Sequence, residues 1–477
     1  MMHHTQNTAI TLSFILLMLS GCRLQHGLLT TLGEDFTAPD LGVATQWHVE
    51  TKPEGEKLDL KNGWTKFNDA LLLDLLESAN QHSATLADAK AKIEQARAQW
   101  IGSQANFLPS LNARAEAGRA TFSFGGPVYT RDQYQIDLQS SWELDLFGGL
   151  ARQAQSMTAQ IQAQHANYES AQIALSAEVA SAYFSLRYVQ VQIHLATQLL
   201  KTQENTLHIT QQAQQAGLNS VNEVQLASAS WQESKAQLLQ LQTQAQRIIK
   251  GLVALSALEE NALQTKLINH EVPRLAQAPN FSIDPIPVNV LLQRPDVNAA
   301  ELEMAQACAD IGVEEAARYP KLTLTGNIAH AFQNMGPSAL MFAQTWSIGP
   351  SLSLPILDYG KRAANVEAAK ARYDAASVHF HAVVRNAVKE VEEAMLRLDT
   401  SGQQKALLSQ ATQNYFSKLQ ASEKLYEAGL TSLLDLQSLQ RVYLQAQKTQ
   451  LELDYESLNA WIALYRAVGG NWQMKNI

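Results

Sequence analysis

Three short motifs in the first half of this 477-residue sequence recur in the second half at nearly one spacing. The paired segments are FLPSL at 107–111 with YPKLTL at 319–324, LDLFGG at 144–149 with ILDYGK at 356–361, and AGLNSVNEVQLAS at 216–228 with AGLTSLLDLQSLQ at 428–440. Aligning Pro109 with Pro320 gives an offset of 211 residues, and aligning Gly148 with Gly360 gives 212. A repeated period indicates a tandem duplication, so the fold has to contain the same unit twice.

Each half predicts one order of elements: a helix, a proline, two strands, a very long helix, a glycine turn and a returning helix. In the first half these elements fall at 67–105, 110–122, 133–147, 149–216 and 218–258. In the second half they fall at 295–318, 321–332, 344–355, 360–428 and 431–468. We therefore expect a first repeat at 66–258, a proline-containing linker at 259–290, a second repeat at 291–468 and a C-terminal tail at 469–477.

The long helices would each extend for about 100 Å at about 1.5 Å per residue. Their apolar residues follow steps of three and four, as at Val179, Ala182, Leu186 and Val189. This pattern predicts a heptad-like seam through which the helices pack on one another. A long soluble coiled coil would explain the helices alone, but it would not explain the strands.

The second predicted strand alternates almost perfectly between apolar and polar residues. Tyr134, Ile136, Leu138 and Trp142 share one face, and Asp137, Glu143 and Asp145 share the other. Long two-faced strands of this kind are typical of a transmembrane β-barrel with lipid outside and water inside. On that interpretation the three acidic residues face the lumen. An antiparallel sheet with one face on a soluble core is the alternative.

Four strands per chain are too few for a barrel, because about eight are needed before side chains merely fill the interior. An open sheet in lipid would leave unpaired backbone groups on both edges. The membrane interpretation therefore requires an oligomer, and twelve strands from a homotrimer would leave a water-filled lumen. The expected fold class is an α+β membrane protein built from a tandem duplication, with a trimeric 12-stranded β-barrel continued by a long α-helical barrel.

The N-terminus carries the features of a secretion signal followed by a cysteine. Residues 1–21 lack Lys, Arg, Asp and Glu, and the apolar run at 9–19 is too short to span a bilayer. LSGC at 19–22 resembles a lipobox, so we expect a signal peptide at 1–21, an N-acyl and S-diacylglycerol lipid on Cys22, and a lipidated segment at 22–65. Arg23, in place of Asp, favours the outer membrane. The alternative is an ordinary signal peptide with an incidental cysteine.

Further motifs give the chain a resemblance to the outer-membrane factor family, the TolC-like exit ducts of bacterial efflux pumps, and above all to its NodT-like lipoprotein branch. They are RPDVNAAELEMAQACADIG at 294–312, YPKLTLTG at 319–326, WELDLFG at 142–148, GWTKFND at 63–69 and the two AGL turns. The resemblance implies a homotrimer whose barrel lies in the outer membrane above a periplasmic α-helical barrel. It also implies two partners, a periplasmic adaptor protein and an inner-membrane transporter, which we expect to be proton-driven.

The resemblance places site residues at the turns and on the helix after the second turn. Residues expected to contact the adaptor are Gly217, Leu218, Asn219, Gly429, Leu430 and Thr431. Leu434 matches a constricting leucine of the family's periplasmic gate, and it could equally be a helix-packing residue. Arg441 matches the arginine of an ion-pair gate whose acidic position falls on Ser438. Asp435 could replace that acid, but its spacing from Arg441 does not place both on one helix face.

Neither enzymatic activity nor a metal site is expected, because no phosphate-binding glycine loop, HExxH pair or GxSxG elbow is present. His379 and His381 point to different faces of a predicted helix. The net charge of −9 argues against a nucleic-acid partner. The expected function is the outer-membrane channel of a tripartite efflux pump. The alternatives are a type I secretion exit duct and a passive porin-like channel.

Overall fold

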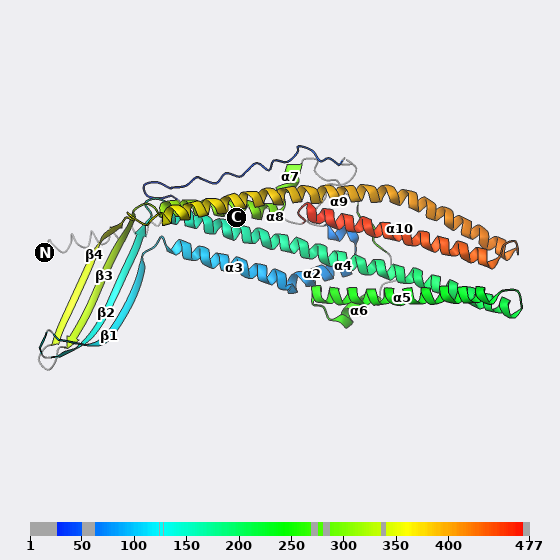
Figure 1. Ribbon diagram of the computed structural model, residues 1–477, viewed down its shortest axis with the longest axis horizontal. Coiled ribbons are helices and arrows are strands. Elements are labelled where there is room, and N and C mark those ends of the chain that lie inside the picture. The colour runs from blue at the N-terminus through cyan, green and yellow to red at the C-terminus, as the bar shows by residue number, and fades with distance from the viewer. Residues whose placement is uncertain are drawn as a thin grey trace. The chain divides into compact units, whose positions relative to one another are not determined.

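The structure, a computed structural model, describes residues 26–49, 63–123, 125–126, 128–268, 275–279, 287–334 and 340–470 (Figure 1). The expected signal peptide and Cys22 lie outside these residues. The chain divides into two compact units, and each unit draws segments from both halves of the sequence. No helix in the described ranges is both long enough and apolar enough to cross a membrane.

The first unit contains one antiparallel sheet of four strands in the order β1-β2-β3-β4 (Figure 1). The strands are β1 Ser110–Phe122, β2 Tyr129–Leu144, β3 Lys321–Asn334 and β4 Leu340–Ser353. β1 and β3 begin at the predicted residues, directly after Pro109 and Pro320. β2 and β4 begin four residues earlier than predicted, at Tyr129 and Leu340.

The hairpin β1–β2 is repeated in the hairpin β3–β4 with the same register. Ser110 pairs with Ser141 in the first hairpin, and Lys321 pairs with Ser353 in the second. The offset between the sequence repeats converts β1 into β3 and β2 into β4. The duplication expected from the sequence is therefore present in the backbone pairing of the sheet.

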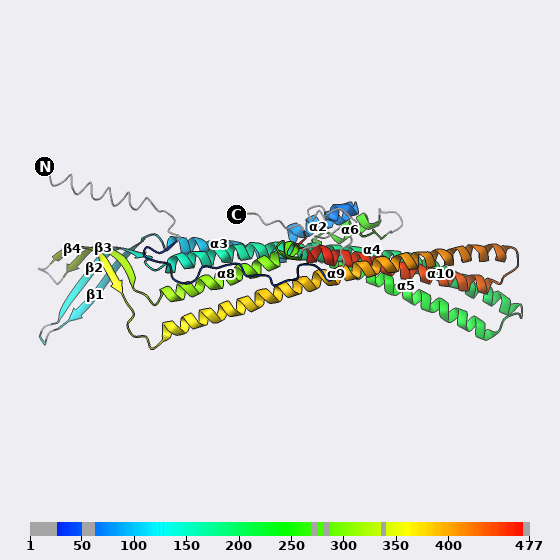
Figure 2. The ribbon, with the colours of Figure 1, turned by 90° about the horizontal axis from the view of Figure 1, so that it is seen from above.

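The long helices occupy nearly the predicted ranges. They are α4 Gly149–Gln215 and α5 Val221–Ser256 in the first half, and α8 Pro295–Ala316, α9 Lys361–Glu427 and α10 Leu433–Ala467 in the second. α4 and α9 have 67 residues each and contribute to both units. Both views show α4 joined to α5, and α9 joined to α10, by a short turn at one end (Figure 2).

The first predicted helix, at 67–105, is instead three elements: η2 Trp64–Phe67, α2 Ala70–His82 and α3 Ala84–Ala105. Asp69 caps α2, because its carboxylate accepts the backbone N–H groups of Leu71 and Leu72. Ser83 has an extended conformation and separates α2 from α3. The predicted linker, 259–290, contains α6 Glu260–Ile268 and all but the last residue of α7 Pro287–Leu291. Leu263 of α6 is fully buried.

The core of the second unit lies where α2, α4, α5 and α10 meet. Trp461 of α10 is fully buried and packs edge-on against Phe67, with ring centroids 4.9 Å apart. Phe67 also lies 4.9 Å from Phe184 of α4. Large aromatic side chains bury more apolar surface than aliphatic ones, so this cluster fixes the helices in the second unit.

Candidate functional site

One face of the sheet is apolar from edge to edge. Ala113, Leu138, Ile328 and Trp346 stand opposite one another on successive strands. In the single chain Trp346 is 74% exposed, and Leu138 and Ile328 are also exposed. An apolar sheet face left open in this way needs a lipid or protein surface to cover it.

The other face of the sheet is polar, and two of the three predicted acidic residues, Asp137 and Glu143, lie on it. Glu143 forms an ion pair with Lys321, with Oε1 and Nζ 3.1 Å apart. Asp137 lies between Arg114 and Ala329 in the pairing, and its side chain is only 2% exposed. One of its oxygens, Oδ1, has no hydrogen-bond partner among the described residues.

Asp145 is not a strand residue, and its predicted place in the strand is wrong. β2 ends at Leu144, and the Asp145 carboxylate accepts the N–H of Ala151 at 2.8 Å. The carbonyl of Asp145 accepts the N–H of Leu28 at 2.7 Å. Asp145 therefore belongs to the junction between β2 and α4.

A segment near the N-terminus, residues 27–35, binds this junction; we call it the N-terminal strap. Leu29 donates to the carbonyl of Leu146, and Leu32 donates to that of Phe147. Arg152 of α4, almost fully buried, donates to the carbonyls of Leu32 at 2.9 Å and Gly33 at 2.7 Å. No sequence pattern indicates these contacts, because the partners lie far apart along the chain.

Close packing of the strap depends on glycine at two positions. Gly33 has a φ of +80°, and a Cβ there would lie 2.8 Å from the Cα of Gly312. Gly148 has a φ of +78°, and a Cβ there would lie 2.8 Å from the Cα of Thr31. Both contacts are shorter than van der Waals distance, so only glycine fits.

The predicted partner-contact turns have one shared geometry. Gly217 and Gly429 adopt φ values of +75° and +73° and end α4 and α9. Leu218 and Leu430 donate to the carbonyls of Ala213 and Leu425, both at 2.8 Å, which closes a Schellman-type C-cap. Both leucine side chains are exposed, so each turn presents an apolar tip.

The helices that follow the turns begin with equivalent caps. Ser220 and Glu223 form a capping box at the start of α5. At the start of α10, Ser432 accepts the N–H of Asp435 at 3.1 Å and donates its hydroxyl to the Asp435 carboxylate at 2.6 Å. Asp435 holds the position in the second repeat that Glu223 holds in the first, so its contacts are those of a helix-capping residue.

The predicted gate residues lie on the first turns of α10. Leu434, Ser438 and Arg441 are exposed in the single chain. Arg441 and Lys448 line a cavity of about 350 Å³ with Leu195 and Leu199 of α4 and Leu241 of α5. Within the described part of the chain no ion pair joins Asp435 to Arg441, and the capping contacts of Asp435 explain why.

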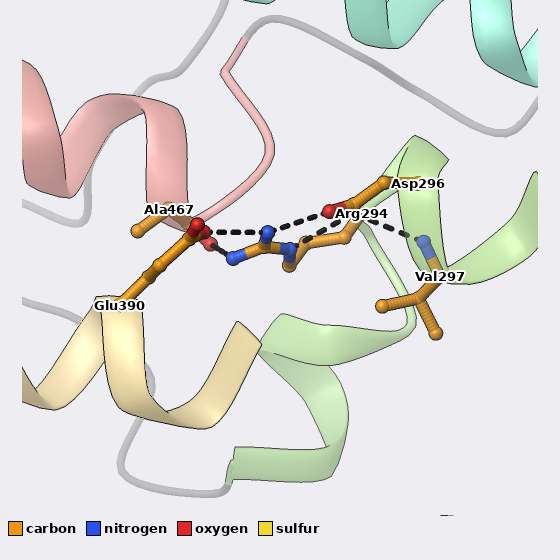
Figure 3. A network of polar contacts seen from close by, with 5 residues as sticks. All are labelled: Arg294, Asp296, Val297, Glu390 and Ala467. Atoms are coloured by element: carbon orange, nitrogen blue, oxygen red, sulfur yellow. Dashed lines mark hydrogen bonds and ion pairs between the residues drawn. The ribbon is translucent and has the colours of Figure 1, made fainter. Parts of the chain in front are cut away.

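A polar network that the sequence did not reveal holds the start of α8 against α9 and α10 (Figure 3). Arg294 is buried and forms a two-point pair with Asp296, at 3.0 and 2.7 Å. It also donates to Glu390 of α9 and to the carbonyl of Ala467 at the end of α10, both at 2.8 Å. Three elements distant in sequence therefore meet at one guanidinium. The RPDV motif at 294–297 is visible in the sequence. The sequence does not show that Arg294 of this motif contacts Glu390 and Ala467.

The two-faced sheet, the long paired helices and the apolar turns define a class of protein, the outer-membrane channels. Residues 75–257 and 286–470 match the family model described as outer membrane efflux protein, and the chain belongs to that family.

Individual relatives extend over nearly the whole chain. It is 27% identical over 471 residues to the solvent efflux pump outer membrane protein SrpC of Pseudomonas putida, across 97% of this chain and 98% of SrpC. It is 26% identical over 481 residues to Nodulation protein T of Rhizobium leguminosarum bv. trifolii, across 98% of each. The solved outer-membrane channel OprN matches with a TM-score of 0.80 and 28% identity, across 92% of this chain and 99% of OprN.

These findings confirm the resemblance to the outer-membrane factor family and its NodT-like branch. The predicted fold class is also confirmed, since the four-stranded sheet and long helices of the chain match those of solved outer-membrane channels. The chain is an outer-membrane channel protein of the efflux type.

Proposed function

We propose that three copies of this chain form the outer-membrane duct of a tripartite efflux pump. In this proposal the three sheets form a 12-stranded barrel, and the long helices extend the duct into the periplasm. The observation that carries the proposal is the open apolar face of the sheet, which includes Leu138, Ile328 and Trp346. A barrel in a bilayer covers that face with lipid and leaves the polar face in water.

Neighbouring residues on β2 test the barrel directly. Leu138 lies on the apolar face and Gln139 on the polar face, and both are exposed. Single cysteines at these two positions, in a Cys308→Ser background, would carry one fluorophore each in vesicles. We expect lipid-borne quenchers to act on the Leu138→Cys probe and a water-soluble quencher to act on the Gln139→Cys probe. Equal responses at both positions would contradict the barrel.

The homotrimer is a separate part of the proposal. Among the residues that the structure describes, β1 and β4 each have one edge that pairs with no other strand, and unpaired backbone groups in lipid cost several kcal/mol each. Mass measurement of the detergent-solubilised particle should give three copies. A monomeric or dimeric particle that still conducts ions would contradict this part.

We propose a lipid anchor on Cys22, on the basis of LSGC at 19–22. Several acyl chains give stable anchoring, because each buried CH₂ contributes about 0.8 kcal/mol. Labelled palmitate should enter the wild-type protein and not the Cys22→Ser variant. Equal labelling of both would contradict the anchor.

An adaptor protein and an inner-membrane transporter, which we expect to be proton-driven, are the proposed partners. The apolar tips at Leu218 and Leu430 suit an adaptor, since both side chains are exposed. A Leu218→Asp and Leu430→Asp double variant should lose copurification of the adaptor and lose export, while its conductance in a bilayer stays unchanged. A passive porin would be indifferent to this change. Export that persists in the double variant would remove the proposed adaptor contact.

A further inference from the structure

The cavity of about 350 Å³ between α4, α5 and α10, which we call the α10 cavity, lies entirely within the second unit. Its volume is in the range of about 300–1,000 Å³ that is typical of small-molecule sites. All three helices contribute aliphatic side chains to its walls: Leu195, Ala196, Leu199, Leu241, Val442 and Leu444. The walls therefore suit a ligand with an apolar body.

Two cationic side chains of α10, Arg441 and Lys448, line the same cavity. They are seven residues apart, so they lie on one face of the helix, about 10 Å apart along its axis. Among the described residues that line the α10 cavity, none is acidic. In a chain with a net charge of −9, this cavity combines positive charge with apolar walls.

Neither cation has a partner within the described part of the chain. Lys448 is half-buried, yet it forms no ion pair or hydrogen bond with another described residue. Glu452, one turn further along α10, is among the described residues that do not pair with it. A half-buried ammonium without a partner has lost part of its hydration and gained no contact in return. An anion inside the cavity would supply that contact.

An ion-pair gate does not explain this arrangement. Asp435, the acidic residue that precedes Arg441 on α10, is engaged with Ser432 as a helix cap. The gate expected from the sequence also gives no role to Lys448 or to the aliphatic walls. The cation pair and the apolar walls therefore need a separate explanation.

We propose that the α10 cavity binds an organic anion with an apolar body, of which a medium-chain carboxylate is the simplest example. The anionic group accepts hydrogen bonds from Lys448, the more buried cation, and Arg441 adds positive potential at the other end of the cavity. The apolar body lies against Leu195 and Leu199 of α4 and Leu241 of α5. This site goes beyond the proposed function, and one chain supplies every lining residue, so it does not require the trimer.

A ligand in the α10 cavity contacts three helices at once. It therefore stabilises the arrangement in which α4, α5 and α10 surround it, because only that arrangement offers both the cations and the apolar walls. Hydrogen exchange of the backbone amides at 195–203 and 441–448 should become slower when octanoate is added. Exchange in the sheet should not change.

Photolabelling of the full-length protein in lipid nanodiscs tests the site and its location. The probe is a medium-chain carboxylic acid that carries a diazirine, and mass spectrometry identifies the labelled peptides. Labelling should fall on the segments that line the α10 cavity. Octanoate should compete with the probe, whereas octylamine, with the same chain and the opposite charge, should not. Labelling spread over the whole chain, or equal competition by octylamine, would overturn the proposal.

Charge variants test the two cations. Lys448→Gln should weaken competition by octanoate by about tenfold, because a hydrogen bond to a charged group is lost. Arg441→Gln should weaken it less, since Arg441 acts from the other end of the cavity. Lys418→Gln, which removes an exposed cation from α9 outside the cavity, is the matched control and should have no effect. Equal affinities in Lys448→Gln and Lys418→Gln would overturn the role of Lys448.

Filling the cavity tests the apolar walls while both cations remain. Ala196→Leu and, separately, Leu241→Phe add volume at the wall and should abolish labelling. The heat-denaturation midpoint of each variant shows whether it is folded, and a folded variant of either kind that still labels at wild-type level would overturn the site. Labelling of the dissociated single chain but not of the assembly would also overturn it, because a neighbouring copy then fills the cavity. If the expected labelling occurs on a particle that is not a trimer, the proposed function fails and the site stands.

Discussion

The guanidinium of Arg152 lies 2.7 Å from the carbonyl oxygen of Gly33, so the part of α4 that belongs to the first unit holds the N-terminal strap. The nearest strap contact to the N-terminus is made by Leu28, which donates to Asp145. Leu28 is six residues beyond Cys22, a reach of at most about 20 Å for extended chain. A lipid on Cys22 would therefore be confined to the neighbourhood of the end of β2.

Replacing Arg152 should release the N-terminal strap. Arg152→Ala leaves the carbonyls of Leu32 and Gly33 without a donor, at a cost of about 1–3 kcal/mol. Limited proteolysis should cut residues 27–39 faster than in the wild type. Arg152→Lys is the matched control, because it keeps the charge but cannot serve both carbonyls from one planar group. Cleavage rates that are equal in Arg152→Ala and wild type would contradict the clamp.

Removing Arg294 should destabilise the second unit, because Asp296, Glu390 and the Ala467 carbonyl lose their shared donor. Breaking a buried pair by removing one partner costs about 3–5 kcal/mol. Both carboxylates are partly hydrated here, at 37% and 41% exposed, so we expect about 2–3 kcal/mol from Arg294→Ala. Heat denaturation of the purified particle provides the measurement. Glu390→Gln, which keeps an acceptor, should cost less, and the reverse order would contradict the network.

The hydroxyl of Tyr183 joins α4 to the cap of α2. It donates to the Asp69 carboxylate at 2.5 Å and accepts from Nε of Arg187 at 2.9 Å. Burial, and then the hydrogen bond to Asp69, raise the pKa of Tyr183, so the hydroxyl keeps its proton over the physiological range. Tyr183→Phe keeps the ring packing and should cost about 1–3 kcal/mol in heat denaturation, because the half-buried Asp69 carboxylate and the buried Arg187 guanidinium lose their partner. The control Tyr188→Phe, in a less buried place on α4, should cost less.

Because of Asp310, we expect the free energy of unfolding to decrease as the pH rises through the acidic range. Burial raises the pKa of Asp310, and the hydroxyl of Ser156, donating at 2.7 Å, opposes that shift in part. At a pH above about 3.9, the pKa of an Asp side chain in the unfolded chain, the native state still holds a proton that the unfolded state has released. The free energy of unfolding therefore decreases between the pKa of Asp310 in the unfolded chain and its raised pKa in the native state. Above the native pKa, Asp310 adds no further pH dependence.

Asp310→Asn should raise the heat-denaturation midpoint at neutral pH and flatten this acidic slope. Ser156→Ala should extend the slope to higher pH, since the carboxylate loses its donor. The measurement is the heat-denaturation midpoint of the wild type, Asp310→Asn and Ser156→Ala over the range from acidic to neutral pH. An unchanged slope in Asp310→Asn would show that another group is responsible.

Periodic features of the sequence predicted the regular elements well, whereas contacts between distant segments could not be predicted. Pro109 and the alternation that follows predicted β1 to the residue. The same alternation continues through Leu144, Asp145 and Leu146, so it carried no sign that β2 ends and that Asp145 turns to Ala151. The strap, which binds residues 145–147, has no periodic pattern that could show its partner.

The role of Asp435 as a helix-capping residue could have been predicted from the sequence. Its place three residues after Ser432 repeats the spacing of Ser220 and Glu223, which is the pattern of a capping box. The duplication alone could have assigned Asp435 to the cap. Its contact with Ser432 leaves Arg441 without that acid as a partner, and Ser438 supplies no charge.

A gate at the start of α10 should therefore depend on Leu434 more than on an ion pair. Leu434 is an exposed apolar residue in the first turn of α10, and three copies on the pore axis would narrow the passage and exclude water. Leu434→Ala should raise single-channel conductance in a lipid bilayer, and Leu434→Met, of similar volume, should leave it near the wild-type value.

Asp435→Asn keeps an acceptor for the Ser432 hydroxyl, so it should leave conductance unchanged. Arg441→Ala should have a smaller effect than Leu434→Ala, because Arg441 forms no ion pair within the described part of the chain. A large rise in Asp435→Asn would restore the ion-pair gate, whereas unchanged conductance in Leu434→Ala and Arg441→Ala together would show that the constriction lies elsewhere and that Leu434 packs against a neighbouring helix.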